Sequence, residues 1–149
     1  MNIILYGKKE CGVLSYESIK KYNSYVNDFE SSMERIFGSD VKKIKTECNF
    51  EARGFFRIEY IYYPQNYKLI IEYSFPVYDV TICDGEGAKN YLFNIIEYKP
   101  CLETKNIETA ILYLHEVLER NDFDLFVCKG KNLYKKSENG LVKIKKLWE

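Results

Sequence analysis

One histidine stands among the residues that could perform acid–base chemistry. His115 lies in the segment NIETAILYLHEVLERND (106–122), and Glu119 follows it four residues later. In a helix this spacing brings the two side chains together, so Glu119 could orient a general base at His115. The same pair is also an ordinary contact on a helix surface. An enzyme centred on His115 is one hypothesis, but we favour a structural or surface role.

Acidic side chains offer a second chemistry. Asp79 lies in a segment with strand character, and Glu72 and Glu59 lie in the segments before it. If the sheet register placed two of these carboxylates side by side, they could form an acid–base pair of the glycosidase type. The chain has 22 acidic residues, so chance pairs are expected. We therefore predict no catalytic residue here and expect a protein that is not an enzyme.

The cysteines are scattered along the chain: Cys11, Cys48, Cys83, Cys101 and Cys128. Their number is odd, no Cys-x-x-Cys pair occurs, and one histidine is too few for a typical Cys/His metal site. We expect reduced, mostly buried thiols, with no metal and no cofactor. The segment DGEG (84–87) lacks the ligand repeat of a calcium loop, and its own charges would repel a phosphate. It is typical of a charged β-turn.

Charge is balanced over the whole chain and uneven within it. Lys+Arg and Asp+Glu both number 22, which argues against a strong nucleic-acid-binding protein. Residues 70–97 have a net charge of −4, with Asp84 and Glu86 among their acidic side chains. Residues 129–149 contain seven lysines and have a net charge of +5. We expect these lysines to protect a sheet edge from aggregation, and a nucleic-acid patch is the alternative.

Residues 15–38 have the apolar spacing of an amphipathic helix. Its stripe consists of Ile19, Tyr22, Val26, Phe29, Met33 and Ile36. Ser15 is placed to cap the start of this helix, and Gly38 follows its end. A second helix is predicted over residues 106–122, with Thr104 or Asn106 as its cap.

The remaining segments indicate strands. They cover residues 41–50, 54–63, 67–75, 77–83 and 123–128, followed by a hairpin over 132–148. Asn139 and Gly140 are the expected turn of that hairpin, because both residues tolerate positive φ. Residues 88–98, AKNYLFNIIEY, fit either a helix or a strand, and we favour the strand. This order predicts a single α+β domain over residues 1–149, with an antiparallel meander and a C-terminal hairpin packed with two main helices.

The segment RGFFRIEY (53–60) resembles the RNP1 sequence of RNA-recognition motifs. The resemblance fails where bases would stack, because Arg57 stands in place of an aromatic residue. The order of elements also differs from that of an RNA-recognition motif. We read the segment as a strand with Phe56, Ile58 and Tyr60 toward the core. Arg57 and Glu59 then lie on the outer face.

Tyrosine is the most informative surplus, with 14 residues, eight of which fall between residues 60 and 98. A buried tyrosine must hydrogen-bond its hydroxyl group, so we expect some of these side chains on the sheet surface. There they would suit a protein interface. No apolar run is long enough for a secretory signal or a membrane span, so we expect a soluble cytoplasmic protein.

The chain resembles the small immunity proteins of bacterial toxin systems, including contact-dependent inhibition. The resemblance covers the N-terminal helix, the aromatic meander, NIETAILYLHEVLERNDFD (106–124) and the hairpin NLYKKSENGLVKI (132–144). It implies an inhibitor that binds a cognate toxin domain, such as a basic nuclease, and blocks its active site. We expect the contact residues to be Asp79, Asp84, Glu86, Tyr73 and Tyr78. The alternative is a nucleic-acid-binding or regulatory module that uses the lysine-rich hairpin.

Overall fold

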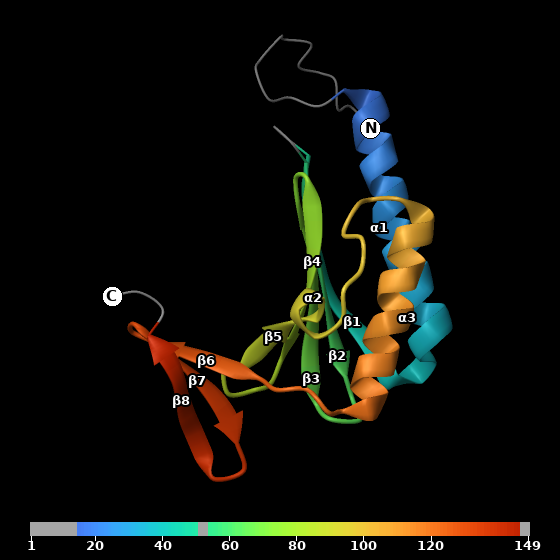
Figure 1. Ribbon diagram of the computed structural model, residues 1–149. Coiled ribbons are helices and arrows are strands. Elements are labelled where there is room, and N and C mark those ends of the chain that lie inside the picture. Colours follow the sequence, from blue (N-terminus) through green and yellow to red (C-terminus); the bar gives the residue numbers. More distant parts are fainter. Residues whose placement is uncertain (1–14, 51–53, 147–149) are drawn as a thin grey trace.

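The computed structural model describes residues 15–50 and 54–146, which form an α+β structure. The elements are α1 Tyr16–Phe37, the 3-10 turn η2 Gly38–Asp40, β1 Val41–Asn49, β2 Phe55–Tyr62, β3 Tyr67–Ser74, β4 Val77–Cys83, β5 Lys89–Tyr91, α2 Leu92–Ile95, α3 Thr104–Arg120, β6 Phe126–Lys129, β7 Asn132–Ser137 and β8 Gly140–Lys146 (Figure 1). The predicted α+β class is confirmed. Predictions that concern Cys11 and Arg53 lie outside the described residues.

All the strands of the described residues belong to one antiparallel sheet of eight, and their order in the sheet is their order in the chain. The meander predicted from the short connections is therefore confirmed. Strand β5 has three residues and meets β6 at one pair, Lys89 with Phe126. Residues 126–146, which we call the hairpin unit, project away from the body of the sheet (Figure 1).

Helices α1 and α3 lie on the same side of the sheet and pack against each other (Figure 1). The alternation of β2, β3 and β4 turns one row of apolar side chains toward these helices. The fully buried members of this layer include Phe56, Ile58, Leu69, Ile71 and Ile82. From α1, Phe29 and Met33 meet them with 0% exposure, as the helical stripe predicts. The core is thus a two-layer packing of helices on a sheet.

The core contains more tyrosine than expected. Tyr60, Tyr62, Tyr73, Tyr78 and Tyr98 are all buried. Tyr78 packs edge-on to Phe29, with ring centroids 4.9 Å apart, and its hydroxyl donates a hydrogen bond to the Asn106 carbonyl at 3.3 Å. The Tyr73 ring stacks on Phe56 at 5.4 Å. Aromatic stacking and the hydrogen bond of Tyr78 to a backbone carbonyl show how the core holds tyrosine side chains that were expected in part on the surface.

Both predicted helices form, with small differences at their ends. The Ser15 hydroxyl caps α1 by accepting a hydrogen bond from the Ser18 amide at 3.1 Å, and Gly38 follows the helix with φ 57°. Helix α3 starts at Thr104, and Glu103 occupies the cap position without a side-chain capping bond. The predicted cap at Thr104 or Asn106 is wrong, because the Thr104 hydroxyl donates to Asp28 of α1 instead.

Residues 88–98 do not form one strand, so that preference is corrected. They contain strand β5, then the single turn α2, and then irregular chain. Two periodicities in one short segment explain the mixed sequence signal. In the C-terminal hairpin, Ser137 pairs with Gly140, so the turn residues are Glu138 and Asn139. Gly140 takes φ 108° just after the turn, so the turn lies one residue earlier than the predicted Asn139 and Gly140.

Residues 55–60 of the segment that resembled RNP1 form the start of β2. Gly54 has φ 80°, and a Cβ atom there would lie 2.9 Å from the Tyr22 ring, so glycine is required. Phe56, Ile58 and Tyr60 are buried toward the helices, as predicted. Arg57 and Glu59 lie on the opposite face of the sheet, which is also as predicted.

Candidate functional site

The face of the sheet opposite the helices carries a set of matched charges. No helix in the described ranges covers this face (Figure 1). Glu47, Arg57, Glu72 and Asp79 are cross-strand neighbours along one row. The Arg57 guanidinium donates to Glu59 and to Glu72, each at 2.9 Å. Lys68 Nζ lies 2.8 Å from a Glu59 oxygen. We call Arg57, Glu59, Lys68 and Glu72 the face network.

Glu59 is the centre of the face network. It is only 7% exposed, although it lies on the face away from the helices. The hydrogen bond from Lys68 lowers the pKa of Glu59, burial opposes this, and the bond from Arg57 adds to the lowering. The net result is a pKa below the usual value for a glutamate. This carboxylate is therefore ionised and fully occupied by its own neighbours.

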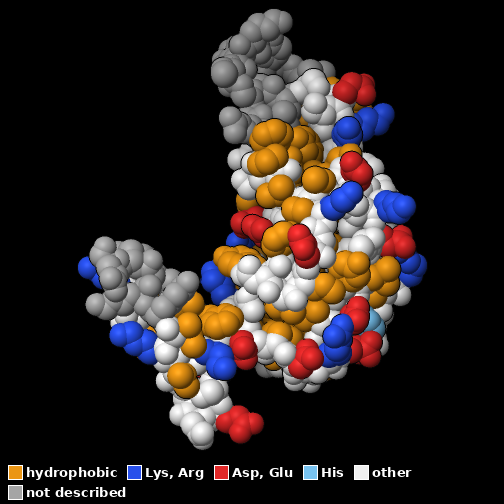
Figure 2. All heavy atoms as spheres, viewed as in Figure 1, with side chains coloured by type: hydrophobic (Ala, Val, Ile, Leu, Met, Phe, Trp, Pro, Cys, Tyr) orange, Lys and Arg blue, Asp and Glu red, His pale blue; other side chains and the backbone are white. Residues whose placement is uncertain are grey.

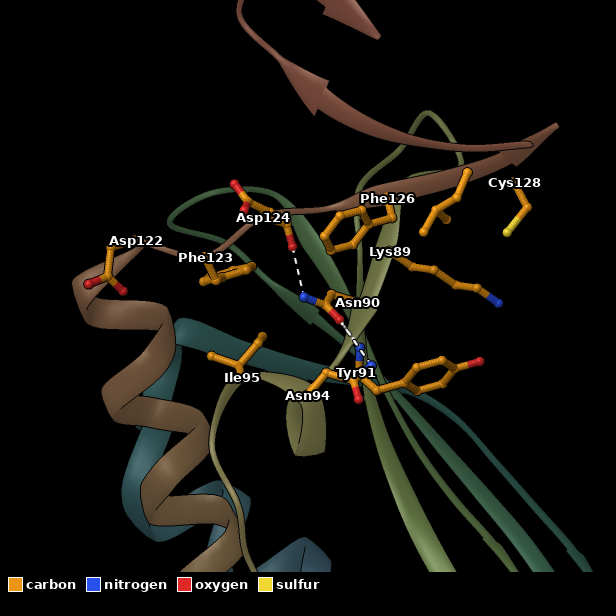
Figure 3. A pocket seen from close by; sticks show the side chains of 11 residues that line it. Lys89, Asn90, Tyr91, Asn94, Ile95, Asp122, Phe123, Asp124, Phe126 and Cys128 are labelled. Carbon is orange, nitrogen blue, oxygen red and sulfur yellow. Dashed lines mark hydrogen bonds between the residues drawn. The ribbon is translucent and has the colours of Figure 1, made fainter. Parts of the chain in front are cut away.

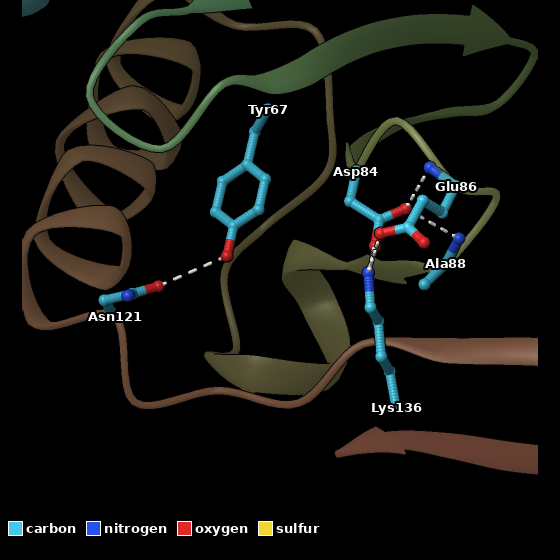
Figure 4. A network of polar contacts seen from close by, with 6 residues as sticks. All are labelled: Tyr67, Asp84, Glu86, Ala88, Asn121 and Lys136. Atoms are coloured by element: carbon cyan, nitrogen blue, oxygen red, sulfur yellow. Dashed lines mark hydrogen bonds and ion pairs between the residues drawn. The ribbon is translucent and has the colours of Figure 1, made fainter. Parts of the chain in front are cut away.

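The DGEG turn holds the hairpin unit against the body. Lys136 of β7 forms ion pairs with Asp84 and with Glu86, the latter at 2.9 Å (Figure 4). Asp84 Oδ1 also accepts hydrogen bonds from the amides of Glu86 and Ala88, at 2.8 and 2.9 Å. Burial opposes ionisation of Asp84, but these bonds outweigh it and lower the pKa of Asp84. We call Asp84, Glu86 and Lys136 the hairpin clip.

A cavity of about 550 Å³ opens where the hairpin unit leaves the body (Figure 3). Its walls come from β5 and α2 on one side and from the α3–β6 connection, β6 and β7 on the other. The lining residues are Lys89, Asn90, Tyr91, Asn94, Ile95, Asp122, Phe123, Asp124, Phe126, Cys128 and Leu133. In Figure 2 the hairpin unit stands off the body, and hydrophobic side chains lie where the two meet.

A second hollow of about 340 Å³ adjoins this cavity along α2 and β4. Tyr91 and Asn94 line both, so the two hollows are neighbours on the surface. Val77, Tyr91 and Phe93 are exposed here by 37%, 39% and 44%. We call this whole surface the β5 groove. Exposed aromatic side chains in a concave surface are typical of protein and ligand contacts.

The carboxylates of the β5 groove are not matched by cations. Asp79 lines one end, and Asp122 and Asp124 line the other. None of the three forms an ion pair within residues 15–50 and 54–146. Lys89 Nζ lies 5.6 Å from the centre of the Tyr91 ring, in a cation–π contact. The groove therefore combines exposed aromatic rings with unmatched negative charge.

The five residues predicted to contact a partner fall into three different places. Tyr73 and Tyr78 are 4% and 0% exposed, so their predicted role as surface contacts is wrong: the alternation of β3 and β4 points them at the helices. Asp84 and Glu86 belong to the hairpin clip. Asp79 lies in the β5 groove, and the buried Tyr78 also lines the second hollow of that groove.

Sequence reasoning missed Tyr91, Phe93, Asp122 and Asp124. The two aromatic residues were in the ambiguous segment 88–98, and their places on a three-residue strand and a one-turn helix leave them exposed. The two aspartates flank Phe123 just after α3. An aromatic residue between two acidic residues, just after the end of a helix, was the sequence signal that could have identified this part of the groove.

The other candidates for chemistry have structural partners. His115 Nδ1 lies 3.0 Å from Glu119, and its ring packs edge-on against Phe37 at 5.0 Å. The register places Glu72 directly opposite Asp79, and Arg57 binds Glu72. Glu59 faces Ile70 rather than Asp79.

The cysteines differ from expectation in their burial. Cys48, Cys101 and Cys128 are exposed and Cys83 is half-buried, so the prediction of mostly buried thiols is wrong. All four are free thiols. Among the described residues, no group of three or more His, Cys, Asp or Glu side chains could hold a metal ion.

No helix within the described residues is long and apolar enough to cross a membrane. Comparisons with protein-family models, with curated proteins and with solved structures found no match.

Proposed function

We propose that this protein is a bacterial immunity protein that binds a cognate toxin domain in the cytoplasm and blocks its active site. The β5 groove is the observation that carries the proposal. It presents exposed aromatic side chains, Tyr91 and Phe93, beside carboxylates without cationic partners. Aromatic anchors in a concave surface are the residues that contribute most to protein–protein affinity. Unmatched carboxylates favour a basic partner.

In this proposal the protein inhibits the toxin by occupying its active site, and no chemical reaction is involved. A bound toxin domain would meet the groove and the projecting hairpin unit, which together form a concave surface (Figure 2). A basic nuclease fits this chemistry, because the active site of such a toxin attracts phosphate and would equally attract Asp79, Asp122 and Asp124.

The test starts from the genes beside the one that encodes this chain. A toxin domain encoded there is expressed in a sensitive strain, with and without this protein, and cell survival is measured. We expect survival only with this protein, together with a stable complex in gel filtration. A neighbourhood without a toxin gene, and a pull-down from the native host without a protein partner, would overturn the proposal.

Surface variants link the inhibition to the groove. The double substitution Tyr91→Ser with Phe93→Ser should abolish protection, because it removes both exposed anchors. Tyr63→Ser is the matched control, since Tyr63 is 54% exposed at the β2–β3 turn, outside the groove. We expect full protection from the control.

A nucleic-acid-binding module is the second candidate, and the cross-strand register is the observation that favours it. Lys42, Lys68, Lys89 and Lys135 lie on the same face, in one row that extends into the hairpin unit. Such binding would weaken steeply with salt. A titration against single-stranded RNA at low salt that shows no binding eliminates this candidate.

A further inference from the structure

The chemistry of the β5 groove also defines what it can accept. This inference deepens the proposed function and rests on it. The lining of the main cavity includes the apolar or aromatic side chains of Tyr91, Ile95, Phe123, Phe126 and Leu133. A volume of about 550 Å³ is in the range of sites that enclose sizeable ligand groups. The main cavity of the groove therefore fits a large apolar side chain.

The ends of the groove have the opposite character. Asp122 and Asp124 line the main cavity, and Asp79 lines the second hollow together with Phe93. Lys89 lines the cavity too, but its ammonium group lies at the Tyr91 ring and makes no ion pair with a described residue. The lining thus has three carboxylates against one lysine. A ligand that removes water from these carboxylates must supply cations, or the complex loses the energy of their hydration.

The floor of the groove is already fixed by hydrogen bonds. Asn90 is 8% exposed, and its Nδ2 donates to the Asp124 carbonyl at 2.9 Å (Figure 3). Its Oδ1 accepts from the Tyr91 amide at 2.8 Å and from Asn94 Nδ2 at 3.5 Å. Asn90 therefore connects β5, α2 and the α3–β6 connection. Because this side chain is satisfied internally, a ligand does not have to order it, which favours affinity.

We propose that the β5 groove binds a segment of the partner protein in which a large apolar side chain lies between arginine or lysine residues. The apolar side chain enters the main cavity beside Phe126. The cations pair with Asp122 and Asp124 at one end and with Asp79 at the other. Arginine fits better than lysine, because its planar group can bind a carboxylate through two hydrogen bonds and stack on Phe93.

Three synthetic hexapeptides test this chemistry, each acetylated and amidated at its ends. One alternates Phe and Arg, one alternates Phe and Glu, and one alternates Ser and Arg. Binding to the full chain is followed by NMR, with the side-chain amide signals of Asn90 and Asn94 as reporters inside the groove. We expect the Phe–Arg peptide to shift these signals, and the other two to bind at least about tenfold more weakly.

A double substitution, Asp122→Asn with Asp124→Asn, tests the position of the cations. It should weaken binding of the Phe–Arg peptide by about tenfold. Glu17→Gln with Glu138→Gln removes the same charge from exposed positions outside the groove and should leave binding unchanged. Equal affinity for the Phe–Glu or the Ser–Arg peptide would overturn the proposal. So would equal effects of the two double variants, or Asn90 and Asn94 signals that do not move.

The outcome separates this inference from the proposed function. If a neighbouring toxin is neutralised while the peptides leave the groove signals unchanged, the inference falls and the inhibitor role stands. If the Phe–Arg peptide binds as expected and no toxin partner exists, the inhibitor role falls and the groove keeps its ligand chemistry.

Discussion

The two charged surfaces of this protein differ in how their charges are matched. In the face network, Glu59 is bound by Lys68 at 2.8 Å and by Arg57 at 2.9 Å, and Arg57 also binds Glu72. In the β5 groove, Asp79, Asp122 and Asp124 form no ion pair with any described residue. The first surface satisfies itself, and the second leaves its charge available to water or to a partner.

This difference indicates what each surface does. A partner on the face network would have to bury charges that already have partners, which costs desolvation and offers no new ion pair. A basic partner on the groove would supply the missing cations next to exposed aromatic rings. Charge density alone does not separate the two surfaces. The two surfaces differ in whether their charged side chains have partners of opposite charge.

The largest expected effect is a loss of stability on substitution of Glu59. Glu59→Gln should lower the free energy of unfolding by about 1–2 kcal/mol, because charged hydrogen bonds to a buried carboxylate are lost. Exposure of the Lys68 side chain, 43%, keeps the loss below that of a fully buried pair. Urea unfolding followed by circular dichroism measures the change.

Glu72→Gln is the matched control for that substitution. Glu72 has one bond to Arg57 and its side chain is 38% exposed, so the loss should stay under about 1 kcal/mol. Equal losses at the two positions would show that burial of Glu59 adds nothing. The proposed difference between Glu59, at the buried centre of the face network, and Glu72, at its exposed edge, would then be wrong.

The location of Glu59 was predictable from the sequence, but its burial was not. Strict alternation in β2 and β3 assigns each residue to a face, so the placement of Phe56, Ile58 and Arg57 followed from period two alone. Burial of Glu59 depends on the register that sets Arg57 opposite Glu72, and on the long side chain of Lys68. The pairing register of β2 and β3 could not be predicted from any turn or bulge recognised in the sequence.

The β5 groove was much less predictable than the sheet. It exists because β5 has three residues and pairs with β6 at one position, which lets the hairpin unit leave the body. The contact between Lys136 and Asp84 spans 52 residues of sequence. No local pattern encodes such a contact, whereas the stripe of α1 and the strands β2 to β4 are local patterns and were predicted within a few residues.

The hairpin clip should give the next largest effect. Asp84→Ala removes the ion pair with Lys136 and both amide hydrogen bonds, and should destabilise the protein by about 1–2 kcal/mol. Asp84→Asn keeps an acceptor for the two amides and loses only the charge. We expect it to be milder in urea unfolding, while hydrogen exchange in β6 and β7 rises in both variants. Unchanged exchange in both would show that the clip does not hold the hairpin unit.

A change of pH should also distinguish the two surfaces, through a change in the free energy of unfolding that is smaller than those of the substitutions above. Because the pKa of Glu59 is lower in the folded than in the unfolded state, its contribution to stability is present above the unfolded value, ~4.3. That contribution disappears as pH falls through the folded-state pKa. The stability advantage of the wild type over Glu59→Gln should therefore shrink below about pH 4. Urea unfolding at a series of pH values measures it, and an advantage that stays constant would contradict the face network.

The smallest effect on stability should come from the groove carboxylates. Asp122→Asn, Asp124→Asn and Asp79→Asn should each change the free energy of unfolding by less than about 0.5 kcal/mol, because no described cation is left unpaired. Combining the first two should add little, or stabilise slightly, because two like charges near Phe123 are removed. Urea unfolding is again the measurement, beside the peptide titrations. A loss as large as that of Glu59→Gln would mean that these carboxylates hold the fold together. If the substitutions change stability little but weaken peptide binding strongly, the negative charge of the groove serves binding to a partner, because it does not stabilise the fold.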